Sequence, residues 1–217
     1  MIIEKLVVSP LQENCYIVGD DDSGLGIVID PGDEAQRIVA KVQQLGLTIP
    51  AVINTHGHVD HIAAAQEVKA ALGANLYLHP ADRRYLPKIV EHGTMFGIFG
   101  AREPEVDVDL NDGDLIPVGS FVVRVTHVPG HTPGGCLLRI GDDVFCGDLV
   151  FSGSIGRTDL PGGDYEKMVA SLEQSILTLP DHIQLHPGHG ASTTVAVERQ
   201  FNPFLRGLRP RPRNNGS

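Results

Sequence analysis

Basic residues are scarce in this chain: 17 lysines and arginines stand against 27 aspartates and glutamates, which gives a net charge of −10. Proteins that bind nucleic acids carry basic patches that meet the phosphates, so this balance argues against a nucleic acid partner. It does not exclude a small anionic molecule held by a local basic residue. Long apolar runs are missing too: no stretch approaches about 18 apolar residues, so we expect no membrane span.

Cysteine is also rare. Cys15, Cys136 and Cys146 are scattered along the chain outside any CxxC pattern, and their number is odd. This usage favours a reduced chain and a cytoplasmic location over a disulfide-stabilised secreted fold. The chain begins "MIIEKLVVSP", with an early acidic residue and no basic segment. We therefore expect a strand there and not a signal peptide.

The residues that are plentiful indicate an ordinary globular domain. The 217 residues are 41% hydrophobic and 20% charged, with 25 glycines and 15 prolines that favour many turns. That length is typical of one compact domain, which can be built of two halves. We expect a single domain over residues 1–205 and a flexible basic tail over residues 206–217, where apolar residues are few.

Short strands that alternate with helices predict the fold class. Apolar residues recur at helical spacing over 33–46, where Asp33 is a candidate N-cap. Strands are expected at 2–9, 14–20, 24–30, 50–55, 74–79, 121–129, 136–140, 143–148 and 182–187, and helices at 33–46, 61–73, 81–91 and 164–177. Residues 92–113 are glycine-rich and predict a surface loop. Strands followed by helices, twice over, indicate an α/β protein with two sheets inside and helices outside.

Three histidines and an aspartate are crowded into the segment "THGHVDH", residues 55–61. His56 and His58 are two positions apart, so in an extended segment both side chains point the same way and can reach one ion. Asp60 and His61 follow at a turn and can reach a second ion. Imidazole and carboxylate together suit zinc, and equally iron or manganese. The alternative is that Asp60 caps a helix and the histidines are surface residues, but four such residues in six positions favour the metal site.

Further candidate ligands follow other predicted strands. His131 lies in "THVPGHTPGG", Asp148 in "VFCGDLVF" and His189 in "LHPGHGAS". Taken singly, each is a weak signal, because such residues are common in exposed turns. Together they form a specific set, since every member has the same position at the end of a strand.

These motifs resemble those of the metallo-β-lactamase fold hydrolases, and the resemblance runs from the first strand to "NPFL" at residues 202–205. The fold that it implies is a four-layer αββα sandwich, with two mixed sheets flanked by helices. The segments "GSIGRTDLPGGD" and "TTVAVERQFNPFL" are similar to the glyoxalase II (hydroxyacylglutathione hydrolase) branch, in particular to a short bacterial subgroup called YcbL-type.

The resemblance implies a site with two divalent metal ions, with zinc the first choice and iron or manganese the alternatives. Its pattern assigns His56, His58 and His131 to the first ion, Asp60, His61 and His189 to the second, and Asp148 to a bridge between them. The implied activity is hydrolysis of a thioester, S-lactoylglutathione, to lactate and glutathione by a metal-bound hydroxide. Asp60 and Asp148 would be the catalytic carboxylates, and Asp60 would orient the attacking water. The sequence contains no GxSxG motif, which would indicate a serine nucleophile.

Substrate contacts are less sharply indicated. The resemblance places a basic residue at Arg157, which could pair with a glutathione carboxylate or, equally well, with Asp159. The loop at residues 92–101 could cover the site with Met95, Phe96, Ile98 and Phe99, although such apolar residues more often pack. Asp30, at the end of a strand, is expected to orient a ligand histidine.

Two other functions stay open at this point. A persulfide dioxygenase shares the fold and the "GRTD" segment and would hold one iron with His56, His131 and Asp148. A non-catalytic binding protein could also use this fold, but the complete ligand set argues against it. A small-molecule thioester, and not a macromolecule, is the expected partner.

Overall fold

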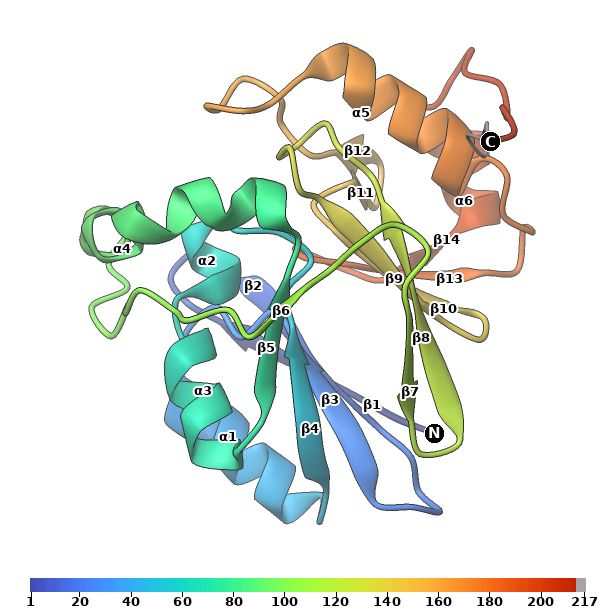
Figure 1. Cartoon of the computed structure of the whole chain (residues 1–217). Helices are drawn as coiled ribbons and strands as arrows, with labels where there is room; N and C mark the ends of the chain where they lie inside the picture. Colours follow the sequence, from blue (N-terminus) through green and yellow to red (C-terminus); the bar gives the residue numbers. More distant parts are fainter. Residues whose placement is uncertain (214–217) are drawn as a thin grey trace.

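The computed structural model describes residues 1–213 of the chain, and a six-stranded mixed sheet forms its first half (Figure 1). The strands lie in chain order: β1 (Ile2–Val8), β2 (Glu13–Gly19), β3 (Leu25–Ile29), β4 (Thr48–Ile53), β5 (Asn75–Leu78) and β6 (Val108–Asp109). The first three pair antiparallel, whereas β3 to β6 pair parallel. Parallel pairing requires crossovers, and helices supply them between β3, β4 and β5.

A second six-stranded sheet forms the other half, in the order β14-β13-β10-β9-β8-β7. Its strands are β7 (Leu115–Val118), β8 (Phe121–His127), β9 (Cys136–Ile140), β10 (Asp143–Gly147), β13 (Gln184–Pro187) and β14 (Thr193–Thr194). Among its strands within residues 1–213, only β10 and β13 pair parallel. A small hairpin of β11 (Val150–Phe151) and β12 (Ser154–Ile155) extends beyond β10.

The helices cover the outer faces of the two sheets (Figure 1). On the first sheet lie α1 (Ala35–Gln44), α2 (Val59–Ile62), α3 (Ala65–Leu72), the 3₁₀ helix η1 (Pro80–Lys88) and α4 (Ile89–Phe96). On the second lie α5 (Tyr165–Ser171), its π-helical continuation η2 (Leu172–Ile176), and α6 (Val195–Phe201). None of the helices within residues 1–213 combines the length and apolar character needed to cross a bilayer.

Three separate apolar clusters hold these layers together. One joins α1 and α3 to the first sheet, through residues such as Ile38 and Val52. Another fills the space between the sheets, where Ile29 and Phe145 are buried. The third joins α5 and η2 to the second sheet and includes Met168, which is fully buried. Three interfaces make four layers, so the predicted αββα sandwich is confirmed.

Several local predictions differ from the structure. The helix expected over 61–73 is two helices, α2 and α3, separated at Ala63 and Ala64. Asp33 does not cap α1; Glu34 is the N-cap, with a left-handed φ of 54° and no side-chain capping bond. The loop expected from residue 92 begins later, because α4 continues to Phe96 and ends at Gly97, whose φ is 79°.

The basic segment after residue 205 lies against the body as far as the structure describes it. The backbone N–H of Arg209 donates to Glu173, and the Arg211 guanidinium pairs with the same carboxylate at 3.0 Å. Arg213 pairs with Asp112 at 2.6 Å. The flexible basic tail expected over residues 206–217 stays a prediction, to which these contacts add three points of attachment; residues 214–217 lie outside the described residues.

Candidate metal centre

Five loops, each at the end of a strand, meet at one edge of the two sheets. The loop after β4 and the short helix α2 that follows it carry four of the candidate ligands, and the loops after β3, β8, β10 and β13 complete the set. The residues brought together are Asp30, His56, His58, Asp60, His61, His131, Asp148 and His189. In open α/β sheets, binding sites form where the carboxyl ends of strands converge. All seven ligands predicted from the sequence are therefore neighbours in space.

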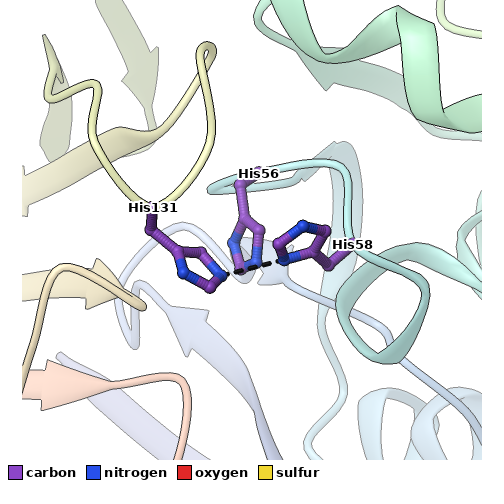
Figure 2. Close-up of side chains that lie close together, drawn as sticks. All are labelled: His56, His58 and His131. Atoms are coloured by element: carbon purple, nitrogen blue, oxygen red, sulfur yellow. Dashed lines mark hydrogen bonds between the residues drawn. The ribbon is translucent and has the colours of Figure 1, made fainter. Parts of the chain in front are cut away.

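The first group consists of His56, His58 and His131, whose ligand atoms all lie within 4.8 Å of one another. Figure 2 shows the three rings converging from two loops. His58 Nδ1 and His131 Nε2 are 2.8 Å apart, too close for both to carry a proton. Three imidazole nitrogens facing a common point are a recognised ligand set for zinc.

The second group consists of Asp60, His61 and His189, again with ligand atoms within 4.8 Å. Asp60 Oδ2 lies 3.2 Å from His189 Nε2 and 3.9 Å from His61 Nε2. A carboxylate with two imidazoles suits zinc, iron or manganese.

Asp148 lies between the two groups. Its Oδ1 is 3.4 Å from Nε2 of His61, in the second group. Its Oδ2 is 3.5 Å from Nε2 of His131, in the first group, and 3.8 Å from Nε2 of His189. One carboxylate thus faces ligand atoms of both groups, which is the geometry that a bridging ligand requires.

Unsatisfied polar atoms indicate that cations fit here. Nε2 of His56, Nε2 of His61 and Oδ1 of Asp148 are buried and have no hydrogen-bond partner among the described residues. Buried polar atoms without partners cost about 1–3 kcal/mol each. The loop after β13 also approaches closely: a Cβ on Gly188 would lie 2.4 Å from Asp148 Oδ1 and 2.5 Å from the His61 ring. Cations bound at the two groups would satisfy all three atoms, so the donor set fits metal ions.

Asp30 fixes the ring orientation of two ligand histidines. Its Oδ2 accepts from His61 Nδ1 at 3.1 Å, which leaves His61 Nε2 free to donate its lone pair to an ion. The same oxygen accepts from the Thr55 hydroxyl at 2.6 Å, and Thr55 Oγ1 lies 3.1 Å from His56 Nδ1. Because the hydroxyl proton is given to Asp30, the oxygen accepts from His56 in the same way. The orienting role expected for Asp30 is borne out by these contacts.

Asp82, which the sequence analysis did not single out, ties two ligand loops together. Its fully buried carboxylate accepts from the backbone N–H of Gly57 at 2.9 Å, between His56 and His58. It also accepts from the Thr132 hydroxyl at 2.7 Å and from the Gly134 N–H at 2.6 Å, beside His131. In the sequence an acidic residue here is an ordinary feature of a helix start, so no local signal distinguished it.

The two ligand groups differ in their electrostatics. Burial lowers the pKa of His56 well below its usual value and that of His58 to about 3, and neighbouring histidines add to the effect. These rings are neutral and offer lone pairs. Burial also opposes protonation of His61, but Asp148 and Asp60 outweigh it and raise its pKa well above the usual value. The second group thus holds a positive charge where a cation can replace the proton.

A cleft of about 710 Å³ opens over the centre. Asp60, His131, Asp148 and His189 reach its floor, and its walls come from η1 and α4 on one side and from the β11–β12 hairpin on the other. Met95 and Phe96, expected at the sequence level to cover the site or to pack, line this cleft and are exposed at 70% and 47%.

Arg157 lines the cleft as well, but its guanidinium is already paired. Nε and one terminal nitrogen donate to the two carboxylate oxygens of Asp159, each at 2.7 Å. The backbone carbonyl of Arg157 accepts from His131 Nδ1 at 2.7 Å and so orients that ligand. The alternative ion pair with Asp159 is therefore present, and substrate binding by the Arg157 side chain stays a prediction.

Comparisons with known proteins agree with this fold. The profile of the Metallo-beta-lactamase superfamily matches residues 8–190. A hydroxyacylglutathione hydrolase, GloC, of Haemophilus influenzae is 36% identical, with 94% of this chain and 98% of the relative covered.

Two solved structures are similar over nearly their whole length. The BLEG-1 B3 metallo-beta-lactamase has a TM-score of 0.88 and 33% identity, over 95% of this chain and 100% of the other. The structure of TTHA1623 in a di-iron-bound form has a TM-score of 0.83 and 38% identity, over 93% and 100%. With the matched profile, the sandwich and the clustered ligands, these similarities show that the chain belongs to the metallo-beta-lactamase superfamily.

Proposed function

We propose that the protein is a metal-dependent thioester hydrolase of the hydroxyacylglutathione hydrolase type, which cleaves S-lactoylglutathione to lactate and glutathione. The observation that carries the proposal is the pair of ligand groups with Asp148 between them. The similarity to the Haemophilus hydroxyacylglutathione hydrolase supports the substrate class. The cleft above the centre has room for a small-molecule substrate.

The ligand roles in this proposal follow the two groups. His56, His58 and His131 would hold one divalent ion, Asp60, His61 and His189 the other, and Asp148 would bridge them. Zinc suits this set best, and the di-iron form of a similar structure makes iron the first alternative, with manganese the second. Bound cations would supply Lewis-acid chemistry, lowering the pKa of water from 15.7 to about 7 and polarising the thioester carbonyl.

The residues of the chain position the reactants. Asp60 lies at the floor of the cleft, where its carboxylate can accept a proton from the attacking water and orient it toward the carbonyl carbon. Asp30, Thr55 and the Arg157 carbonyl keep the ligand rings in place. The leaving group is a thiolate, which departs without strong help from a general acid. No serine nucleophile is required.

A paired experiment tests this proposal. The purified protein is analysed for its metals, and the same sample is assayed for S-lactoylglutathione hydrolysis, for oxygen uptake with glutathione persulfide, and for hydrolysis of a chromogenic β-lactam. We expect about two ions per chain, as in two-metal hydrolases, together with thioester hydrolysis that is lost on chelation and returns on adding zinc. One iron per chain with oxygen uptake and no thioester hydrolysis would overturn the proposal in favour of a persulfide dioxygenase. Turnover of the β-lactam alone would move the assignment to a β-lactamase.

Metal binding should also be visible as stability. A chelator is expected to lower the melting temperature, and zinc at 1,000 times its dissociation constant should restore about 4 kcal/mol. The reason is that His56 Nε2, His61 Nε2 and Asp148 Oδ1 are buried without partners until a cation satisfies them. Differential scanning fluorimetry measures the shift, and magnesium serves as the control because it prefers oxygen ligands. A melting temperature that changes neither with the chelator nor with zinc would contradict the assignment of the metal centre.

A further inference from the structure

Basic side chains are concentrated on one wall of the cleft, although the chain as a whole carries a net charge of −10. Arg84, Lys88 and His92 line it at intervals of four residues along η1 and α4. All three side chains line the same cleft, so they can face one ligand together. Among the described residues that line the cleft, Asp60 and Asp148 are the only carboxylates, and both belong to the ligand set.

Arg84 and Lys88 differ from the neighbouring cations in having no acidic partner. Arg83, next in sequence, pairs with Asp109 at 2.6 Å, and Arg157 across the cleft pairs with Asp159. Within residues 1–213, Arg84 and Lys88 form no ion pair, and both side chains are exposed. Exposed cations that converge on a cleft without internal partners are available to an anionic ligand.

One aromatic ring connects this wall to the metal centre. The centroids of the Tyr85 and His58 rings are 5.2 Å apart. The Arg84 guanidinium carbon lies 6.0 Å from the centroid of the same Tyr85 ring. The Tyr85 hydroxyl donates to the Pro161 carbonyl at 2.8 Å, which holds the ring in place. Arg84 is thus one ring removed from a candidate ligand, so a single small molecule can touch both.

We propose that Arg84 and Lys88 are specificity-determining residues that bind an anionic group on the thiol half of the substrate while its thioester lies at the metal centre. The inference rests on the proposed thioester hydrolysis and adds to it the recognition of charge. The shared chemistry is a carboxylate or a phosphate, as in thioesters of glutathione or of coenzyme A. Guanidinium and ammonium groups bind both kinds of anion.

The test compares substrates that differ only in charge. S-Lactoylglutathione and its diester, in which both glutathione carboxylates are blocked, are hydrolysed by the wild type, Arg84→Ala, Lys88→Ala and the control Arg83→Ala. Each cleft variant should raise KM for S-lactoylglutathione about tenfold, equivalent to about 1.4 kcal/mol, with kcat little changed. Neither should alter KM for the diester. Arg83→Ala removes a cation of the same helix that pairs with Asp109, and it should leave both substrates unaffected.

The outcomes separate this inference from the proposed function. If wild type hydrolyses both substrates with equal KM, or the cleft variants affect both equally, the recognition role is wrong and the thioesterase stands. If a coenzyme A thioester, and not the glutathione thioester, shows the charge-dependent KM, the anion is phosphate. If no thioester is hydrolysed, the affinity for glutathione, measured by calorimetry, still tests the role of Arg84 and Lys88. Weaker binding by Arg84→Ala and Lys88→Ala than by Arg83→Ala supports anion recognition by these two residues, and equal binding overturns it.

Discussion

Asp148→Asn should lower kcat/KM for S-lactoylglutathione about a thousandfold, which corresponds to about 4 kcal/mol of barrier. Asparagine keeps the shape of the side chain but removes the negative charge. Asp148 is the carboxylate that faces His61 in one ligand group and His131 in the other. Loss of its charge should therefore weaken the binding of both metal ions. Kinetics with parallel metal analysis should show reduced metal content together with the reduced rate.

The same strand supplies a matched control. Asp143, at the start of β10, also contacts a histidine: its Oδ1 lies 2.7 Å from His186 Nε2, outside the ligand groups. Asp143→Asn should therefore change kcat/KM less than about twofold, since neither Asp143 nor His186 belongs to a ligand group or lines the cleft. An Asp148→Asn protein that keeps its metals and stays within tenfold of wild-type activity would exclude a bridging role.

Asp82→Ala should lower the free energy of unfolding by about 3 kcal/mol, because it leaves buried donors without an acceptor. Those donors are the N–H groups of Gly57 and Gly134 and the hydroxyl of Thr132. They belong to the loops that present His56, His58 and His131, so metal affinity should also fall, by about 10- to 100-fold as for other residues that orient ligands. Urea titrations with and without zinc separate the two effects.

Two further variants make this prediction specific. Asp82→Asn keeps one acceptor oxygen and should lie between wild type and Asp82→Ala in both stability and metal affinity. Asp109→Ala removes an exposed carboxylate paired with Arg83 and should change stability by less than about 1 kcal/mol. If Asp82→Ala unfolds at the same urea concentration as the wild type, the hydrogen bonds of Asp82 do not stabilise the two ligand loops.

The sequence predicted the layered fold and the ligand cluster well because both leave local patterns. Strands with buried, alternating or continuous apolar runs are visible by themselves, and His56, His58, Asp60 and His61 are adjacent in one motif. His131, Asp148 and His189 each follow a strand, and the resemblance to a known family joined them to the set. Their ligand roles remain a prediction of that resemblance, although the structure places all seven together.

Long-range contacts were not predictable in the same way. Asp82 contacts Thr132 and Gly134 across 50 and 52 residues, and nothing in "HPADRRY" distinguishes it from a helix-start acid. The division of the expected helix 61–73 into α2 and α3 leaves Ala63 and Ala64, both good helix formers, in the break. Which of the cleft's arginines are already paired also depends on three-dimensional neighbours, so the sequence favoured Arg157 and gave no signal for Arg84.

Neither of the two ligand groups described above is complete within one half of the sandwich. His56 and His58 come from the first sheet's loops, and His131 comes from the second's; Asp60 and His61 likewise need His189. An ion bound between His58 and His131 therefore closes a loop of 73 residues, as a disulfide would, but reversibly and under control of metal supply. If the chain were cut between β6 and β7, the two fragments should reassemble into an active complex only when the metal is present to bridge them.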